Sequence, residues 1–144
     1  MPKTQIYPFI DNGNGVYRPF VPIRIINPLD NINILLYGLL DTGADECIFP
    51  KFICEATNHN LKGEGVISSD SQGVGQGSVT NWKHTFIIEL LTPDKKTVFW
   101  RSKQNLIGCL DHDSAPPLLG FKNFMVNFRI TFNYPTKRII IQLD

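Results

Sequence analysis

The sequence predicts an all-β domain built as a closed barrel, with one short helix in the C-terminal half. Three observations favour this fold class. Apolar segments short enough to be strands recur about every 8 to 14 residues, turn signals rich in Gly, Pro, Asn and Asp separate them, and a single segment has helical spacing. The 144 residues are enough for one domain that folds without disulfides.

The composition excludes several classes of function. Hydrophobic residues make up 42% and charged residues 19%, as in ordinary globular domains. Lys and Arg number 14 against 13 Asp and Glu, with no basic cluster, so we expect no nucleic-acid partner. No segment approaches the roughly 18 apolar residues of a membrane helix, and the first residues lack the apolar core of a signal peptide. We therefore expect no membrane contact and a cytoplasmic location.

We expect an N-terminal arm over residues 1–16, ahead of a domain that covers residues 17–144. Two prolines and the run DNGNG interrupt any regular pattern in the arm, so a docked arm and an unattached tail both fit it. The domain begins with a strand at 17–27, whose two prolines favour a sheet edge. A second strand, at 32–40, is largely apolar and ends at Asp41.

The middle of the chain predicts a second hairpin. An apolar patch at 45–58 allows a helical turn, and segments 63–72 and 78–91 flank the glycine-rich run GVGQG. Two short strands, 97–102 and 105–110, follow. In the long strand of the hairpin, alternate side chains share one face. These side chains are Trp82, His84, Phe86, Ile88 and Leu90.

The C-terminal part predicts the helix and a last hairpin. Residues 121–128 carry apolar side chains at positions i, i+3, i+4 and i+7, which is helical spacing. The segments RITFN and RIIIQLD are joined by the turn YPTK and alternate like two strands of a hairpin.

Asp41 stands at the end of the apolar run LLYGLL and directly before Thr-Gly. A carboxylate at such an edge loses hydration, so it requires hydrogen bonds or a neighbour that shares its proton. Two further features follow the segment DTGAD (41–45) along the chain. They are the glycine-rich GVGQG at 73–77 and the segment PLLGFKNFMVNF at 117–128.

These three elements resemble, in order and spacing, the active-site signature, the flap and the late Gly-helix element of the retropepsin-like aspartic proteases. The resemblance covers roughly residues 20–134 and is closest to cellular, bacterial or retroelement-derived members. It implies the acid-protease barrel and the activity of an endopeptidase on peptides or proteins. The catalytic residues that it implies are Asp41, Thr42 and Gly43, and the substrate-binding residues are Ala44, Asp45, Gly73, Val74 and Gly75.

The resemblance also implies a homodimer. In this family two aspartates share one proton across a bound water, because two close carboxylates cannot both ionise cheaply. This chain supplies one Asp-Thr-Gly, so an active form needs two copies with the site on their two-fold axis. The chemistry implies no metal and no organic cofactor.

Two features depart from the family pattern. Many retroviral enzymes have Arg after the late glycine, whereas Gly120 is followed by Phe121, so a basic partner for Asp45 would come from Lys122 or Arg129 or be absent. The last strand is an addition to the retroviral pattern. We expect the C-terminal hairpin, with the N-terminal arm, to build the dimer sheet, because unpaired apolar edges invite pairing.

Other interpretations stay open. The chain could be a catalytically silent peptide-binding or protein-interaction module with the same fold, or a segment trimmed out of a polyprotein. The run GVGQG could be an ordinary hairpin turn. We expect His59, His84 and His112 to be solvated loop residues, and the three cysteines to be reduced thiols without a metal.

Overall fold

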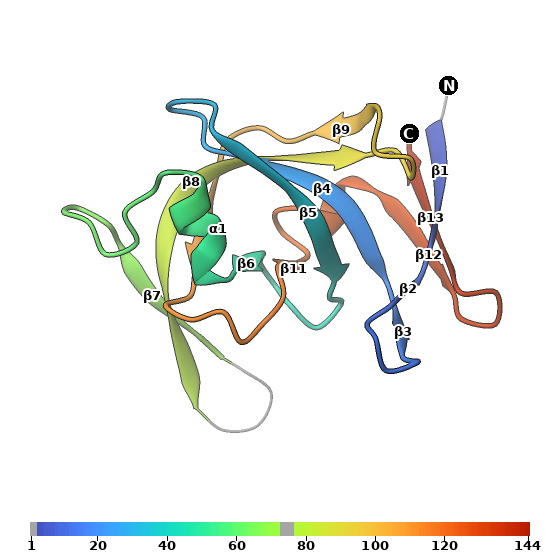
Figure 1. The fold of residues 1–144 in the computed structure, drawn as a ribbon, viewed down its shortest axis with the longest axis horizontal. Coiled ribbons are helices and arrows are strands. Elements are labelled where there is room, and N and C mark those ends of the chain that lie inside the picture. Colours follow the sequence, from blue (N-terminus) through green and yellow to red (C-terminus); the bar gives the residue numbers. More distant parts are fainter. Residues whose placement is uncertain (1–2, 73–76) are drawn as a thin grey trace.

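A ring of strands forms the body of the protein. The computed structural model describes residues 3–72 and 77–144. Within these residues, the ring runs in the order β4 (Phe20–Ile26), β5 (Asn33–Leu40), β11 (Leu118–Leu119), β6 (Ile48–Phe49), β10 (Asn105–Cys109) and β8 (Ser78–Leu91). Strand β8 pairs with both β10 and β4, so the sheet closes on itself (Figure 1). The expected all-β, closed barrel-like fold is confirmed.

Strand β4 lies inside the ring, which corrects the expectation of a sheet edge. It pairs with β5 along its whole length but with β8 only from Ile23 onward. Pro22 lies one residue before that point, and Pro19 precedes the strand. A proline is tolerated where its missing N–H has no partner strand to meet. The prolines therefore mark the beginning of an interior strand.

Strand β8 carries the alternation that the sequence indicates. His84, Phe86, Ile88 and Leu90 are buried and Trp82 is half-buried, so the shared inward face is confirmed. Strands β7 (Ser68–Gln72) and β8 form the expected hairpin, which projects from the ring at the lower left of Figure 1. Strand β9 (Val98–Arg101) pairs with the other end of β8.

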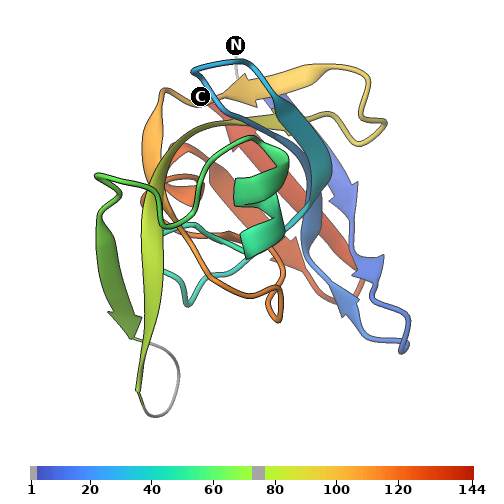
Figure 2. The same cartoon turned by 60° about the vertical axis from the view of Figure 1, so that its left-hand side comes forward.

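The helical elements differ from the expectation. The helix α1 (Lys51–Ala56) follows Pro50 and lies over one end of the ring (Figure 2). In the C-terminal half the structure has only the 3₁₀ helix η1 (Met125–Asn127) among the described residues. The N–H of Met125 donates to the carbonyl of Gly120 at 3.0 Å, a span of five residues that is wider than an α-helical turn. The helical spacing instead brings Phe124 and Phe128 inward onto Trp100.

The two ends of the chain pair with each other. Strand β1 (Lys3–Pro8) runs antiparallel to β13 (Arg138–Leu143), and β12 (Arg129–Asn133) pairs with the other side of β13. Two further strands, β2 (Ile10–Asp11) and β3 (Tyr17–Arg18), form a small hairpin. The expectation of irregular structure before residue 17 is wrong, because Tyr7 and Phe9 give this segment a buried apolar face. The division into arm and domain stays a prediction.

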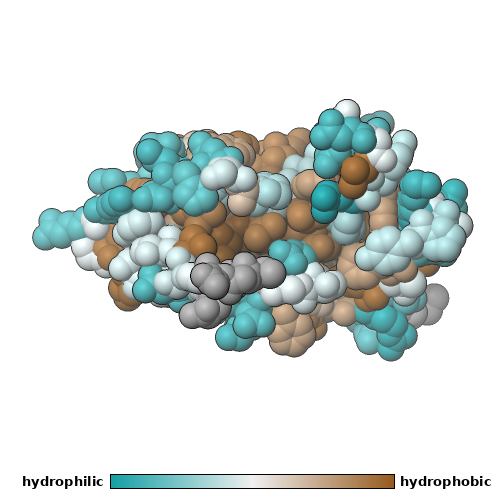
Figure 3. Space-filling view, turned by 90° about the horizontal axis from the view of Figure 1, so that it is seen from below, coloured by the Kyte–Doolittle hydropathy of each residue, from teal (hydrophilic) through white to brown (hydrophobic). Residues whose placement is uncertain are grey.

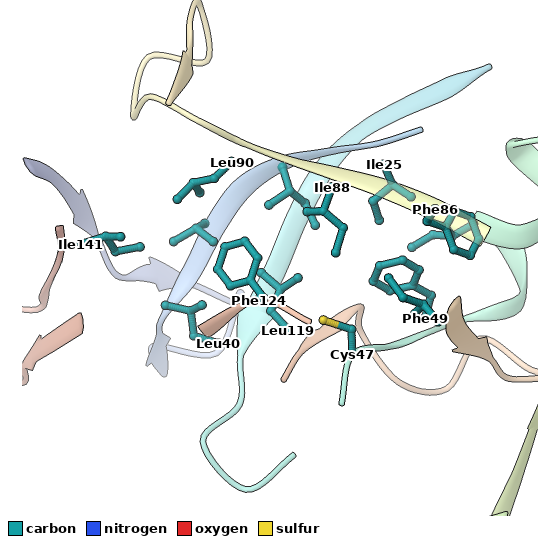
Figure 4. Packing of buried hydrophobic residues seen from close by; sticks show 14 of the residues in the cluster. Ile25, Leu40, Cys47, Phe49, Phe86, Ile88, Leu90, Leu119, Phe124 and Ile141 are labelled. Atoms are coloured by element: carbon teal, nitrogen blue, oxygen red, sulfur yellow. The ribbon is translucent and has the colours of Figure 1, made fainter. Parts of the chain in front are cut away.

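The apolar core fills the ring and extends under the terminal sheet. Figure 4 shows Leu40, Leu119 and Phe124, from three separate segments, directed into the same space. Ile139 and Ile141 of β13 are fully buried in the same cluster. Among the described residues, no helix has the length and apolarity needed to cross a membrane.

Candidate active site

Asp41 begins the loop that connects β5 to β6. Strand β11 inserts between these two strands, parallel to β5 and antiparallel to β6. The N–H of Asp41 donates to the carbonyl of Leu119 at 3.1 Å, and the N–H of Leu39 donates to that of Pro117 at 2.8 Å. Two distant segments thus fix the backbone of Asp41 without using its side chain.

Residues after β11 run directly against the 41–47 loop. The N–H of Lys122 donates to the carbonyl of Asp45 at 2.8 Å, and the N–H of Gly120 to Cys47 Sγ at 3.3 Å. Burial raises the pKa of Cys47 to about 12, so this thiol stays protonated and serves as packing. The late glycine therefore acts on the loop from its inner side.

The Asp41 carboxylate is oriented by its own loop. Asp41 is half-buried, and its Oδ1 accepts a hydrogen bond from the N–H of Gly43 at 2.9 Å. A Cβ on Gly43 would lie 3.3 Å from that oxygen, so the absence of a side chain permits the approach. Thr42 is exposed, and its hydroxyl has no hydrogen bond to any described residue. One carboxylate oxygen is thus held, and the other is available.

A groove of ≈ 590 Å³ opens above this loop. Asp41, Gly43, Ala44 and Asp45 line one part of it, which brings together four of the site residues that the resemblance implies. Strands β7 and β8 supply Asp70, Ser71 and Val79 on one side, and apolar side chains complete the floor: Ile48, Leu110, Ala115 and Leu118. Seen from below the view of Figure 1, apolar side chains gather in the hollowed centre of this face within a more polar rim (Figure 3).

The groove contains residues that sequence reasoning missed. Asp70, Ser71 and His112 line it, but they carry no motif, and only pairing between distant strands brings them there. His112 is exposed, and its Nδ1 lies 2.6 Å from the hydroxyl of Ser114. No local sequence signal identifies these positions.

The basic partner expected for Asp45 is not formed within the described residues. Lys122 Nζ lies 3.8 Å from Glu46 Oε1, and Arg129 pairs with the last residue of the chain at 3.9 Å. Lys83 also pairs with Glu46, at 3.3 Å. Glu46, rather than Asp45, is the acid that the basic side chains surround. These pairs are partly exposed, so they orient the loop more than they stabilise it.

The predicted flap residues Gly73, Val74 and Gly75 lie outside the described residues. The hairpin leading to them is braced by Asn81, a fully buried polar residue of β8. Its Oδ1 accepts from the hydroxyl of Ser69 at 3.2 Å, and its Nδ2 donates to that of Ser71 at 2.9 Å. Ser71 lines the groove, so this brace sets the position of a groove wall.

The histidines do not all lie in solvated loops. His84 is buried on β8 and His59 is half-buried, which corrects the expectation for both, whereas His112 is exposed. The three cysteines are buried free thiols, as expected. Over residues 3–72 and 77–144, no group of three or more His, Cys, Asp or Glu side chains is arranged to hold a metal ion.

Comparison with known proteins agrees with the geometry at the level of the fold. No family model matches the sequence, and no curated protein matches it. Among solved structures, the chain is similar to a retropepsin-like aspartic protease from Rickettsia conorii, with a TM-score of 0.65 and 13% identity. The match covers 99% of this chain and 94% of that one. The fold is therefore that of a retropepsin-like acid protease.

Proposed function

We propose that this chain is one half of a homodimeric aspartic endopeptidase. The observation that carries the proposal is the position of Asp41, held by its backbone between two distant segments and exposed to the floor of a groove. The retropepsin-like fold supports this interpretation. A purely structural role would not require an acid with one oxygen free in a groove, because a partly buried carboxylate is costly.

Catalysis would use a water held between the Asp41 carboxylates of two chains. One carboxylate accepts a proton from the water as the water attacks the peptide carbonyl, while the protonated partner donates a hydrogen bond to the carbonyl oxygen. The bond from the N–H of Gly43 keeps one oxygen in place and directs the other toward the axis. Because the two carboxylates share one proton, cleavage is fastest at acidic to mildly acidic pH.

The substrate would be an extended peptide. A peptide that lies along the edges of the groove gains main-chain hydrogen bonds as an added strand, and its side chains enter apolar subsites. Ile48, Val79 and Leu118 supply such surface on two sides of the acid. We expect hydrophobic side chains next to the bond that is cleaved.

The dimer follows from the number of carboxylates. The chain has one Asp-Thr-Gly, and the reaction needs two aspartates, so a C₂ axis has to pass beside Asp41. The exposed hydroxyl of Thr42 is free to form a hydrogen bond across that axis. Strand β13 is paired on both sides within the chain, so only β1 and β12 offer free edges of the terminal sheet to a second copy. The dimer sheet itself stays a prediction.

A peptide-library digest tests the proposal. Purified protein is incubated with the library at several acidic pH values, beside the Asp41→Asn variant and a sample with a transition-state-mimic inhibitor. We expect cleavage that both the substitution and the inhibitor abolish. Cleavage that survives Asp41→Asn would reject the mechanism. Peptide binding without cleavage by a demonstrated dimer would favour the silent binding module.

A further inference from the structure

A cluster of two thiols and two imidazoles lies beneath α1, and none of its members lines the groove. Cys54 comes from α1, Cys109 from β10 and His84 from β8, while His59 follows α1. Both thiols are fully buried, His84 is 6% exposed and His59 is half-buried. Peptide hydrolysis at Asp41 has no use for these groups, and core packing alone does not require them.

Backbone carbonyls fix both imidazole rings. His84 Nε2 lies 2.9 Å from the carbonyl oxygen of Leu61, and His59 Nε2 lies 3.0 Å from that of Thr85. A carbonyl only accepts hydrogen bonds, so each Nε2 carries a proton. The ring centroids are 4.8 Å apart. The Nδ1 atom of His84 is therefore the nitrogen left to exchange a proton with another group.

Cys54 is the centre of the cluster. It is hydrogen-bonded to the thiol of Cys109 and to the ring of His84, and its Sγ lies 3.9 Å from the carbonyl oxygen of His59. The hydrogen bond from Cys109 and then that from His84 lower the pKa of Cys54, whereas the contact with Cys54 and burial raise the pKa of Cys109. Although burial opposes it, contact with Cys54 raises the pKa of His84. A thiolate thus lies beside a proton donor and a second thiol.

The contacts favour redox chemistry over metal binding. Within the described ranges, these four side chains are not arranged to hold a metal ion. A low-pKa thiol in contact with a second thiol is the arrangement found in oxidisable cysteine pairs. We propose that Cys54 and Cys109 are a hydroperoxide-oxidisable dithiol that closes to a disulfide between α1 and β10.

The reaction balances in two steps. The Cys54 thiolate attacks one oxygen of hydrogen peroxide, the O–O bond breaks, and the other oxygen leaves as water after taking a proton from His84. The product is a sulfenic acid on Cys54. The sulfur of Cys109 then attacks that sulfur, the S–O bond breaks, and a second water leaves with the proton of Cys109. Two thiols lose two electrons, and one peroxide is reduced to two waters.

Access to the buried pair comes from the short helix α1. Its N-cap residue, Pro50, makes no side-chain hydrogen bond, so this end of the helix opens at low cost. The disulfide would join α1 to β10, which leads directly into Leu110 in the groove. The start of α1 also holds the next loop, since the N–H of Phe52 donates to the carboxylate of Asp113 at 2.8 Å.

Peptide mapping tests the dithiol directly, because trypsin places each cysteine on its own peptide. Cys54 lies on 52–62, Cys109 on 104–122 and Cys47 on 25–51. The folded protein is treated with hydrogen peroxide, quenched, alkylated under denaturing conditions and digested without reductant. We expect 52–62 joined to 104–122 in a product that reductant separates, with Cys47 still alkylated. Alkylation of all three cysteines, under conditions that oxidise the synthetic peptide 52–62, would overturn the proposal.

Variants separate the roles within the cluster. Cys54→Ser leaves Cys109 alkylatable, and Cys109→Ser leaves Cys54 as a sulfenic acid that a dimedone probe captures. His84→Gln keeps an N–H donor for Leu61 but removes the base, so we expect oxidation at neutral pH to slow at least about tenfold. Circular dichroism verifies that this variant is folded. An unchanged rate in the folded variant would contradict the role of His84, and cross-links that include Cys47 would contradict the pairing.

Discussion

The backbone of Gly120 packs against that of Glu46 so closely that no other residue fits at position 120. A Cβ on Gly120 would overlap the carbonyl group of Glu46 and lie 2.9 Å from the nitrogen of Cys47. Both atoms belong to the backbone of the loop that starts at Asp41, so neither can turn aside as a flexible side chain would. The contact fixes how deep the loop sits over the core.

Gly120→Ala should therefore destabilise the protein. The added methyl group forces the 41–47 loop away from β11, and overpacking of this kind typically costs about 1–3 kcal/mol. Urea unfolding measures the change as a lower midpoint at the same slope. An unchanged midpoint would show that the loop yields without cost.

Gly43→Ala provides the contrast to that variant. Its Cβ would lie 3.3 Å from Asp41 Oδ1, which a small shift of the carboxylate relieves. We expect the unfolding midpoint to stay close to that of the wild type while peptide cleavage falls. Equal effects of the two glycine variants on stability would argue against separate roles for the two positions.

Asn81→Ala should loosen the hairpin that leads to the predicted flap. The change leaves the hydroxyls of Ser69 and Ser71 without their partner, which costs about 1–3 kcal/mol. Because Ser71 lines the groove, KM should rise more than kcat falls. The matched control is Thr80→Ala in the same hairpin, which removes an exposed bond to Asp70 and should change stability by less than about 0.5 kcal/mol.

Tyr7 ties the N-terminal strand to the barrel and should make stability fall at alkaline pH. Its buried hydroxyl donates to the carbonyl of Leu91 at 2.6 Å, and burial raises the pKa of Tyr7 above its ordinary value of 10.0. Above about pH 10 the unfolded chain releases this proton while the folded chain keeps it, so the unfolded state binds fewer protons. The stabilisation is complete below that pH and is lost as the pH rises.

Tyr7→Phe should lower the stability at neutral pH by about 1–2 kcal/mol and flatten the alkaline decline. Unfolding curves between neutral pH and pH 11 measure both effects. Tyr134→Phe, at an exposed position, is the control and should leave the neutral midpoint unchanged. An alkaline decline of the same steepness in Tyr7→Phe would assign it to another group.

Local patterns in the sequence were enough to predict the hairpins and the ends of the long strands. The alternation from Trp82 to Leu90 indicates β8 correctly, and the apolar run before Asp41 indicates β5, because side-chain periodicity follows directly from strand geometry. The glycine after Leu119 could also be identified as a special position from its place in the chain. These features depend on residues that are close in sequence.

Features that depend on distant pairing could not be predicted. Strand β11 is only two residues long, and its insertion beside Asp41 has no periodicity to reveal it. The N-terminal segment pairs with the other end of the chain, so its prolines suggested an irregular arm. The contact between Cys54 and Cys109 likewise arises only when α1 and β10 meet. Residues 121–128 had helical spacing, but contacts with the ring gave them a wider turn.

Subunit mixing tests most directly the claim that two copies of Asp41 form one site. Wild-type chains are refolded together with increasing fractions of Asp41→Asn chains, and peptide cleavage is measured at a fixed total concentration. If each site needs an Asp41 from both chains, activity follows the square of the wild-type fraction, and an equal mixture keeps about a quarter. An equal mixture that keeps about half would mean that one chain suffices, and would contradict the two-carboxylate site.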